Sequence, residues 1–109
     1  MNNNARRGQI IGTGLIGGSV ALALGEAGWH VTGVDIDPQR AERAKEIGVI
    51  DAIGIDSEAE LTVVAVPAGA LEVEIRNALN QTKGMVTDTG SVKTMVARNI
   101  DDPRFVPGH

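Results

Sequence analysis

A glycine-rich turn between an apolar strand and an apolar helix constrains this chain more than any other feature. The residues Gln9-Ile10-Ile11 lead into the turn, whose sequence is Gly12-Thr-Gly-Leu-Ile-Gly-Gly18. In this pattern the first glycine allows a sharp reversal, the second lets a phosphate group approach the backbone, and the third lets helix and strand pack closely. The following helix presents free N–H groups and a partial positive charge at its N-terminus. The stretch therefore predicts binding of a diphosphate.

The glycine pattern alone is weak evidence, because 14 of the 109 residues are glycine and a mobile loop explains the same letters. Its context is more specific. A second apolar strand, residues 30–34, is followed by Asp35, which lies 18 residues beyond Gly17. A carboxylate at this position accepts hydrogen bonds from the ribose hydroxyls of a bound dinucleotide. Strand, turn, helix and acid in this order predict a dinucleotide-binding domain.

The charge of Asp35 bears on which dinucleotide is bound. A carboxylate there repels a 2′-phosphate, so the sequence favours NAD over NADP as the cofactor. Arg40 could pair with such a phosphate, but an exposed arginine on a helix usually lies in solvent. The interpretation requires that Asp35 faces a ligand, and an Asp35 held in an ion pair would weaken it.

Strands and helices alternate along the chain. Hydrophobic periodicity predicts strands over residues 9–11, 30–34, 49–54, 61–66, 85–88 and 104–107, and helices over 15–27, 38–47, 68–80 and from 91 onward. Asp37 is expected to cap the second helix, with Pro38 as its first residue. The expected buried faces contain Ala41, Ala44 and Ile47 in the second helix, Leu71, Ile75, Ala78 and Leu79 in the third, and Val92, Met95, Val96 and Ile100 in the fourth.

This alternation predicts right-handed βαβ units and one parallel sheet. The expected fold class is α/β, a Rossmann-type doubly wound sheet in a single domain. Residues 1–7 are expected to form a disordered leader, and residues 8–109 the NAD-binding Rossmann domain.

Composition excludes several classes of function. The net charge of −4, without a basic cluster, argues against nucleic acid or an anionic membrane as a partner. No stretch approaches the roughly 20 apolar residues of a membrane span. The chain contains no cysteine, which removes disulfides and thiolate metal sites and fits a cytoplasmic protein. His30 and His109 are expected at opposite edges of the sheet, so no metal site is predicted.

Ligands of open α/β sheets bind beyond the carboxyl ends of the strands, where the strand order reverses. The turns at Gly12, Asp35, Pro67, Gly90 and His109 are expected at this edge. The candidate cofactor-binding residues are Gly12, Thr13, Gly14, Leu15, Ile16, Gly17, Asp35, Val66, Pro67 and Gly90. From spacing alone Ser91 is a helix N-cap that could also touch a ligand, and His109 is a terminal residue without an assigned partner.

Five segments together resemble the N-terminal nucleotide-binding domain of the prephenate/arogenate dehydrogenase family. They are, in order, Gly12 to Ser19, Val34-Asp35 with Asp37-Pro38, Val64-Ala-Val-Pro67, Asp88-Thr-Gly-Ser-Val-Lys93 and Phe105-Val-Pro-Gly-His109. The glycine turn is shared by many dehydrogenases, whereas Gly-Ser-Val-Lys followed by a strand ending in Pro-Gly-His is more specific.

The resemblance implies an activity on the route to tyrosine. Members of the family oxidise prephenate or arogenate by hydride transfer to the nicotinamide, while the ring carboxylate leaves as CO2. The resemblance implies that His109 is catalytic and accepts the proton of the substrate's ring hydroxyl, and that Ser91 helps to orient that hydroxyl. An imidazole with a pKa of about 6.5 suits this role.

Family members continue beyond this histidine into a helical domain that supplies dimerisation and much of the substrate pocket. We therefore expect this chain to be a truncated part of such an enzyme, without turnover by itself and dimeric only with the helical domain. Two alternatives stay open. One is another NAD(P)-dependent hydroxyacid or imine reductase, and the other is a non-catalytic NAD-sensing module.

Overall fold

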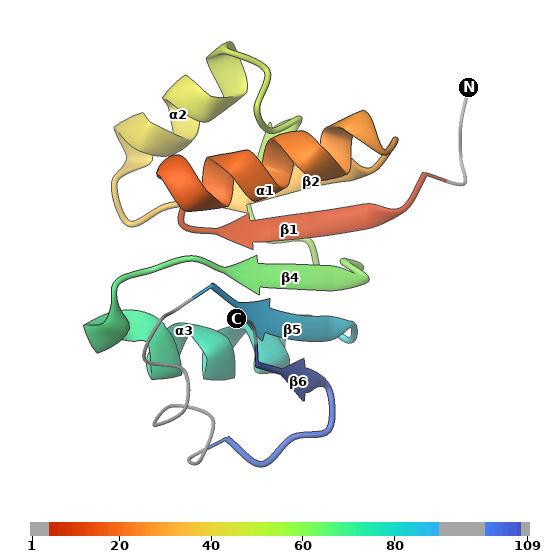
Figure 1. Cartoon of the computed structure of the whole chain (residues 1–109), viewed down its shortest axis with the longest axis vertical. Helices are drawn as coiled ribbons and strands as arrows, with labels where there is room; N and C mark the ends of the chain where they lie inside the picture. Colours follow the sequence, from red (N-terminus) through yellow and green to blue (C-terminus); the bar gives the residue numbers. More distant parts are fainter. Residues whose placement is uncertain (1–4, 90–99, 108–109) are drawn as a thin grey trace.

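The structure is a computed structural model, and it describes residues 5–89 and 100–107. Its elements are, in chain order, β1 (Arg7–Ile11), α1 (Leu15–Glu26), β2 (His30–Val34), α2 (Pro38–Glu46), β3 (Ala52–Ile53), β4 (Leu61–Val64), α3 (Ala68–Gln81), β5 (Met85–Asp88) and β6 (Phe105–Val106) (Figure 1).

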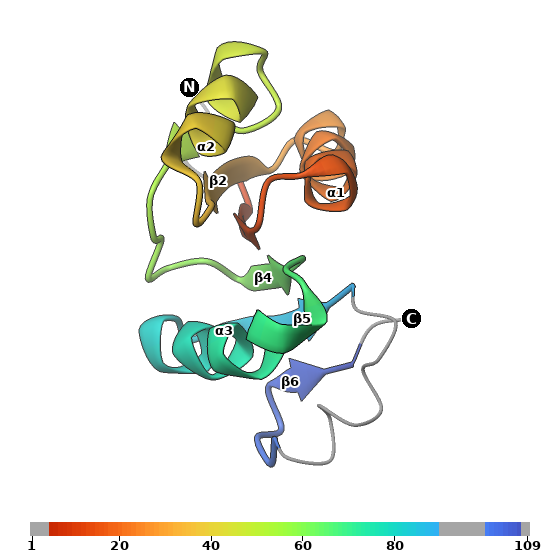
Figure 2. The same cartoon turned by 90° about the vertical axis from the view of Figure 1, so that its left-hand side faces the viewer.

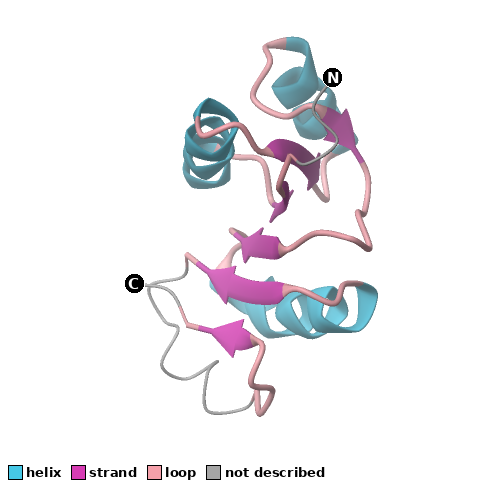
Figure 3. Ribbon diagram, turned by 90° about the vertical axis from the view of Figure 1, so that its right-hand side faces the viewer, coloured by secondary structure: helices cyan, strands magenta, loops and turns pink. Residues whose placement is uncertain are grey.

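All six strands lie parallel in one sheet, in the order β3-β2-β1-β4-β5-β6. Helices α1 and α3 cover opposite sides of this sheet (Figures 2 and 3). The strand order is that of the Rossmann fold, and it reverses between β1 and β4. The predicted α/β fold with a doubly wound parallel sheet is confirmed.

Alternate residues of the central strands face two separate hydrophobic cores. Ile10 and Val31 pack with Ala21 of α1 and Ala44 of α2 on one face. On the other face, Ile11 and Val64 pack with α3 and β5, in a cluster that also contains Leu71, Ile75, Ala78, Leu79, Val86, Ile100 and Phe105. The predicted buried faces of α2 at Ala41 and Ala44, and of α3, are confirmed.

The prediction for Ile47 is wrong, because this side chain is 57% exposed. Helix α2 ends at Glu46, and Ile47 is its C-cap, where the chain leaves the helical path toward Gly48 with a φ of +83°. The start of α2 is as predicted, since the Asp37 carboxylate accepts a hydrogen bond from Gln39 N–H (3.0 Å) and Pro38 is the first helical residue.

The strands predicted over residues 49–54 and 61–66 are shorter in the structure. Only Ala52–Ile53 of residues 49–54 forms a strand, because the N–H groups of Val49 and Ile50 bond to the Ala44 carbonyl at the end of α2 instead. The strand predicted over residues 61–66 ends at Val64, three residues before Pro67.

The prediction that residues 1–7 form a disordered leader is wrong for Arg7. Arg7 is the first residue of β1 and pairs with His30 in the sheet register, and the Arg6 guanidinium lies 3.2 Å from a Glu60 carboxylate oxygen.

The predicted helix from residue 91 lies outside the described residues, except for Ile100, which is buried. Within the predicted strand 104–107, residues Phe105–Val106 form β6.

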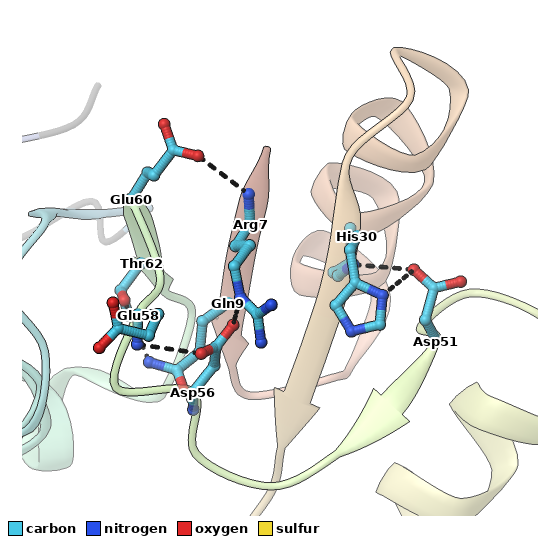
Figure 4. A network of polar contacts seen from close by, with 9 residues as sticks. Arg7, Gln9, His30, Asp51, Asp56, Glu58, Glu60 and Thr62 are labelled. Atoms are coloured by element: carbon cyan, nitrogen blue, oxygen red, sulfur yellow. Dashed lines mark hydrogen bonds and ion pairs between the residues drawn. The ribbon is translucent and has the colours of Figure 1, made fainter. Parts of the chain in front are cut away.

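A polar network joins the amino end of the sheet to the connection between β3 and β4 (Figure 4). Gln9, which is fully buried, donates a hydrogen bond to Thr62 Oγ1 (3.1 Å) and accepts one from Asp56 N–H (2.7 Å). The Asp56 carboxylate in turn accepts hydrogen bonds from Arg7 Nε (2.8 Å) and Glu58 N–H (3.0 Å). These contacts fix the position of residues 54–60, which connect β3 to β4 without a helix.

Replacement of this carboxylate tests the network. Burial by itself raises the pKa of Asp56, but the Arg7 guanidinium and the Glu58 N–H lower it, and the net pKa is below its ordinary value. We expect Asp56→Asn to lower the free energy of unfolding at neutral pH by about 1–3 kcal/mol, because the variant loses its charge-assisted bond to Arg7.

This effect has a defined pH dependence. A carboxyl group with a lowered folded pKa stabilises the protein above its unfolded pKa of about 3.9, and this contribution is lost as the pH falls through the folded pKa. The difference between wild type and Asp56→Asn, measured by urea unfolding, should therefore shrink below about pH 4. Asp101→Asn, at an exposed carboxylate, is the control. An equal loss of stability at every pH would contradict the role of the charge.

Candidate functional site

The site lies at the carboxyl ends of β1, β2 and β4, where the strand order reverses (Figure 1). Gly12 N–H bonds to the Val34 carbonyl (2.8 Å), and Ala65 N–H bonds to the Ile11 carbonyl (2.7 Å). These bonds bring the glycine turn, the end of β2 and the segment before Pro67 to one edge, as predicted. Gly90, Ser91 and His109 lie outside the described residues.

The three glycines of the motif differ in what surrounds them. Gly12 has a φ of +96°, and a Cβ atom there would collide with the Ala65 carbonyl oxygen. A Cβ at Gly17 would collide with the Gly12 carbonyl oxygen, so the helix packs directly against the turn. At Gly14, in contrast, a Cβ would meet no atom within 4 Å. Packing within the fold therefore requires glycine at positions 12 and 17. At position 14 a side chain would enter open space.

The first turn of α1 is open toward solvent. Gly14 is the N-cap, no side chain of the described residues caps the helix, and the first helical hydrogen bond runs from Gly18 N–H to the Gly14 carbonyl (2.7 Å). Leu15 is 92% exposed and Ile16 is 61% exposed. Helix N–H groups before this first bond have no partner within the helix, and they form an electropositive end that attracts anions.

Asp35 follows β2 as predicted, and its carboxylate accepts hydrogen bonds from the protein itself. One oxygen, Oδ2, accepts hydrogen bonds from the N–H (2.7 Å) and the hydroxyl (3.1 Å) of Thr13. The other, Oδ1, accepts from Asp37 N–H (2.9 Å) and from Arg40 Nη1 (3.0 Å). The side chain is 2% exposed. The acid therefore ties the glycine turn to the start of α2.

These contacts also set the charge state of the acid. Burial by itself raises the pKa of Asp35, but the N–H groups of Asp37 and Thr13, the Thr13 hydroxyl and the Arg40 charge lower it, with a net pKa below its ordinary value. Arg40, which we expected to lie only in solvent, is ion-paired with Asp35, so that expectation is wrong. Its side chain nevertheless stays 52% exposed.

A groove between α1 and α2 continues from the glycine turn. It is lined by Thr13, Gly14, Leu15, Gly18, Ser19, Leu22, Arg40, Arg43, Ala44, Ile47 and Val49. Apart from the turn itself, sequence analysis did not assign these residues to the site. The available signal was the placement of two arginines, Arg40 and Arg43, on the helix that follows Asp35.

The other predicted residues lie near the turn. Val66 is half-buried and packs against the core beside α3, and a Cβ at Gly12 would lie 3.2 Å from its Cγ1. Pro67 is exposed and serves as the N-cap of α3.

Comparisons with known proteins show the family to which this chain belongs. A family model described as "Prephenate dehydrogenase, nucleotide-binding domain" matches residues 20–109. The chain belongs to this family. Prephenate dehydrogenase from Bacillus subtilis (strain 168) is 33% identical over 115 residues, an alignment that covers 92% of this chain and 31% of the relative.

Two solved structures are also similar. One is prephenate dehydrogenase from A. aeolicus in complex with hydroxyphenyl propionate and NAD+, with a TM-score of 0.83 and 26% identity, covering 100% of this chain and 43% of that one. The other is Synechocystis arogenate dehydrogenase, with a TM-score of 0.77 and 28% identity, covering 84% and 35%. The chain thus spans about a third of the curated relative it matches.

Two further properties of the described residues bear on other functions. They contain no group of three or more His, Asp or Glu side chains that could hold a metal ion. No helix among them is long and apolar enough to cross a membrane.

Alanine substitutions distinguish the two kinds of glycine. We expect Gly17→Ala to destabilise the domain by about 3 kcal/mol or more, because its Cβ meets a backbone carbonyl that cannot move independently of β1. Gly14→Ala should cost about 1 kcal/mol or less, since it changes only an N-cap residue in open space. Urea unfolding of both variants measures the difference. Equal losses of stability would show that the two positions are equally confined.

Proposed function

We propose that this chain is the NAD-binding part of a dehydrogenase that acts on prephenate or arogenate. Membership of the family supports the proposal, and so does the similarity to the A. aeolicus enzyme, whose structure is a complex with NAD+. Because the chain spans between 31% and 43% of these relatives, the activity belongs to a complete enzyme in this proposal.

The observation that carries the proposal is the open space at Gly14. This glycine lies at the N-terminus of α1, between two glycines that the fold itself confines. Nothing in the described part of the chain fills the space that a side chain there would take. A diphosphate in this place would meet the helix N–H groups and their partial positive charge. The residues present therefore fit the cofactor.

The chemistry of the proposed reaction is an oxidative decarboxylation. When bound, NAD would supply the acceptor for a hydride from the ring carbon that bears the hydroxyl, with loss of the ring carboxylate as CO2 and aromatisation of the ring. We assign His109 as the base that takes the proton of this hydroxyl, and Ser91 as the residue that orients the hydroxyl. Thr13, Leu15, Ile16, Val66, Pro67 and Gly90 are proposed to line the cofactor.

The remaining parts of the proposal follow the family resemblance. The substrate is a small molecule, and prephenate and arogenate are both compatible with this domain. A homodimer would require the helical domain of the family. We expect neither nucleic acid nor a membrane as partner, and we propose a cytoplasmic location.

Binding of NAD tests the proposal directly. We expect Gly14→Val to abolish NAD binding, measured by calorimetry on the 109-residue chain, while thermal unfolding remains close to that of the wild type, because the new side chain occupies the place of the diphosphate. Gly25→Val is the matched control, since Gly25 also lies in α1 with no atom near an added Cβ. Unchanged NAD affinity in Gly14→Val would refute the proposed site.

The role of His109 is tested in a complete enzyme that carries this sequence. His109→Asn should lower kcat by about 10²–10⁴-fold, as expected for loss of a general base, with little change in NAD affinity. His30→Asn is the control, because His30 is the first residue of β2 and lies beside Asp51, away from the glycine turn (Figure 4). Equal losses of kcat and NAD affinity in His109→Asn would assign a structural role to this residue.

A further inference from the structure

The inference concerns Arg104, the residue before β6, and it rests on the proposed function. The Arg104 guanidinium donates hydrogen bonds to three backbone carbonyls near the end of α3. Nη1 bonds to the carbonyls of Thr82 (2.7 Å) and Gly84 (3.4 Å), and Nη2 bonds to that of Leu79. Nη2 also lies 3.5 Å from an Asp102 carboxylate oxygen. One side chain thus joins the start of β6 to a segment 20 to 25 residues earlier in the chain.

These bonds supply what the C-terminus of α3 lacks in its own sequence. The last carbonyls of a helix have no partner within the helix, and the helix dipole favours a cation beside them. The last turn of α3, residues 78–81, contains no basic residue. Arg104 provides this positive charge from a distant segment, and its side chain is only 33% exposed. The end of α3 therefore fixes the position of Arg104.

β6 is anchored at its start. It is two residues long, lies at the edge of the sheet and pairs with β5 (Figure 1). Phe105 is buried in the hydrophobic core beside α3. Val106 is 43% exposed, and Pro107 is also exposed. The contacts of Arg104 and Phe105 therefore set the register of this short strand against β5.

The direction of β6 makes this register important for the site. β6 is parallel to β5, so it ends at the carboxyl edge of the sheet, where the cofactor is proposed to bind. His109, the proposed base, follows Val106 by three residues in the sequence. A strand rises about 3.3 Å per residue, and a general base has to lie about 2.6–3.2 Å from the atom whose proton it takes. A slip of β6 by one residue would therefore take the base out of reach.

We propose that Arg104 is a positioning residue for the proposed reaction. By bonding to the end of α3 it fixes the register of β6, and through β6 the point from which His109 reaches the substrate hydroxyl. Arg104 touches neither substrate nor cofactor in this proposal. Its effect on the reaction passes entirely through His109.

A double-mutant cycle in a complete enzyme that carries this sequence tests the proposal. Reduction of NAD is followed with prephenate and with arogenate in the wild type, Arg104→Gln, His109→Asn and the double variant. We expect Arg104→Gln to lower kcat by about 10–100-fold while NAD affinity changes less than about twofold, because the base is misplaced and the cofactor contacts are not. In the His109→Asn background, Arg104→Gln should lower kcat by less than about twofold, since the base is already absent.

Two further variants separate positioning from stability. Arg104→Lys keeps the positive charge but not the forked donors, so it should recover part of kcat, and it replaces Arg104→Gln in the cycle if thermal unfolding shows that Arg104→Gln is not folded. Asp56→Asn is the control for stability, because it weakens the network around Arg7, away from β6. Asp56→Asn should leave kcat within about twofold of the wild type.

The outcomes separate this inference from the proposed function. If the losses in kcat from Arg104→Gln and His109→Asn multiply in the double variant, Arg104 acts independently of the base, and the inference is overturned while the proposed function stands. The same conclusion follows if a folded Arg104→Gln keeps the kcat of the wild type, or if Asp56→Asn lowers kcat as much as Arg104→Gln does. If the wild type reduces NAD with neither substrate, both proposals are overturned.

Discussion

The direct contact between α1 and β1 is the constraint on which the rest of this structure depends. Gly17 lies against the carbonyl of Gly12, with no room for a side chain between them. This contact places the first turn of α1 at the end of β1, beside the point where the strand order reverses. An electropositive helix end, an open edge of the sheet and the open space at Gly14 thus coincide.

A second constraint is the buried carboxylate of Asp35. It joins the glycine turn to the start of α2 through Thr13 and Asp37, two residues from segments that are far apart along the chain. The turn is therefore held in place by the protein, before any ligand binds. Both oxygens of this carboxylate accept hydrogen bonds from the protein's own donors.

The two edges of the sheet use polar residues in different ways. At the amino edge, Asp56 bonds to both Arg7 and Gln9, and these bonds hold the connection between β3 and β4 in place. At the carboxyl edge, Leu15 and Ile36 are more than 90% exposed, and α1 has no side-chain cap from the part of the chain that the structure describes. The polar groups of this network at the amino edge bond to one another. The carboxyl edge presents exposed apolar side chains and an uncapped helix N-terminus. This division fits a nucleotide-binding domain of the prephenate dehydrogenase family.

The sequence by itself determined the strand and helix order, the parallel sheet and the position of the glycine turn, because these depend on local periodicity and on residues that only one backbone geometry accepts. It also placed Asp35 at the carboxyl edge of the sheet. Only the tertiary structure decided which donors surround that carboxylate, since Thr13 and Arg40 approach it from separate segments. It also decided that Arg7 belongs to the sheet and that Ile47 is exposed, because strand pairing and the end of a helix depend on partners that periodicity does not reveal.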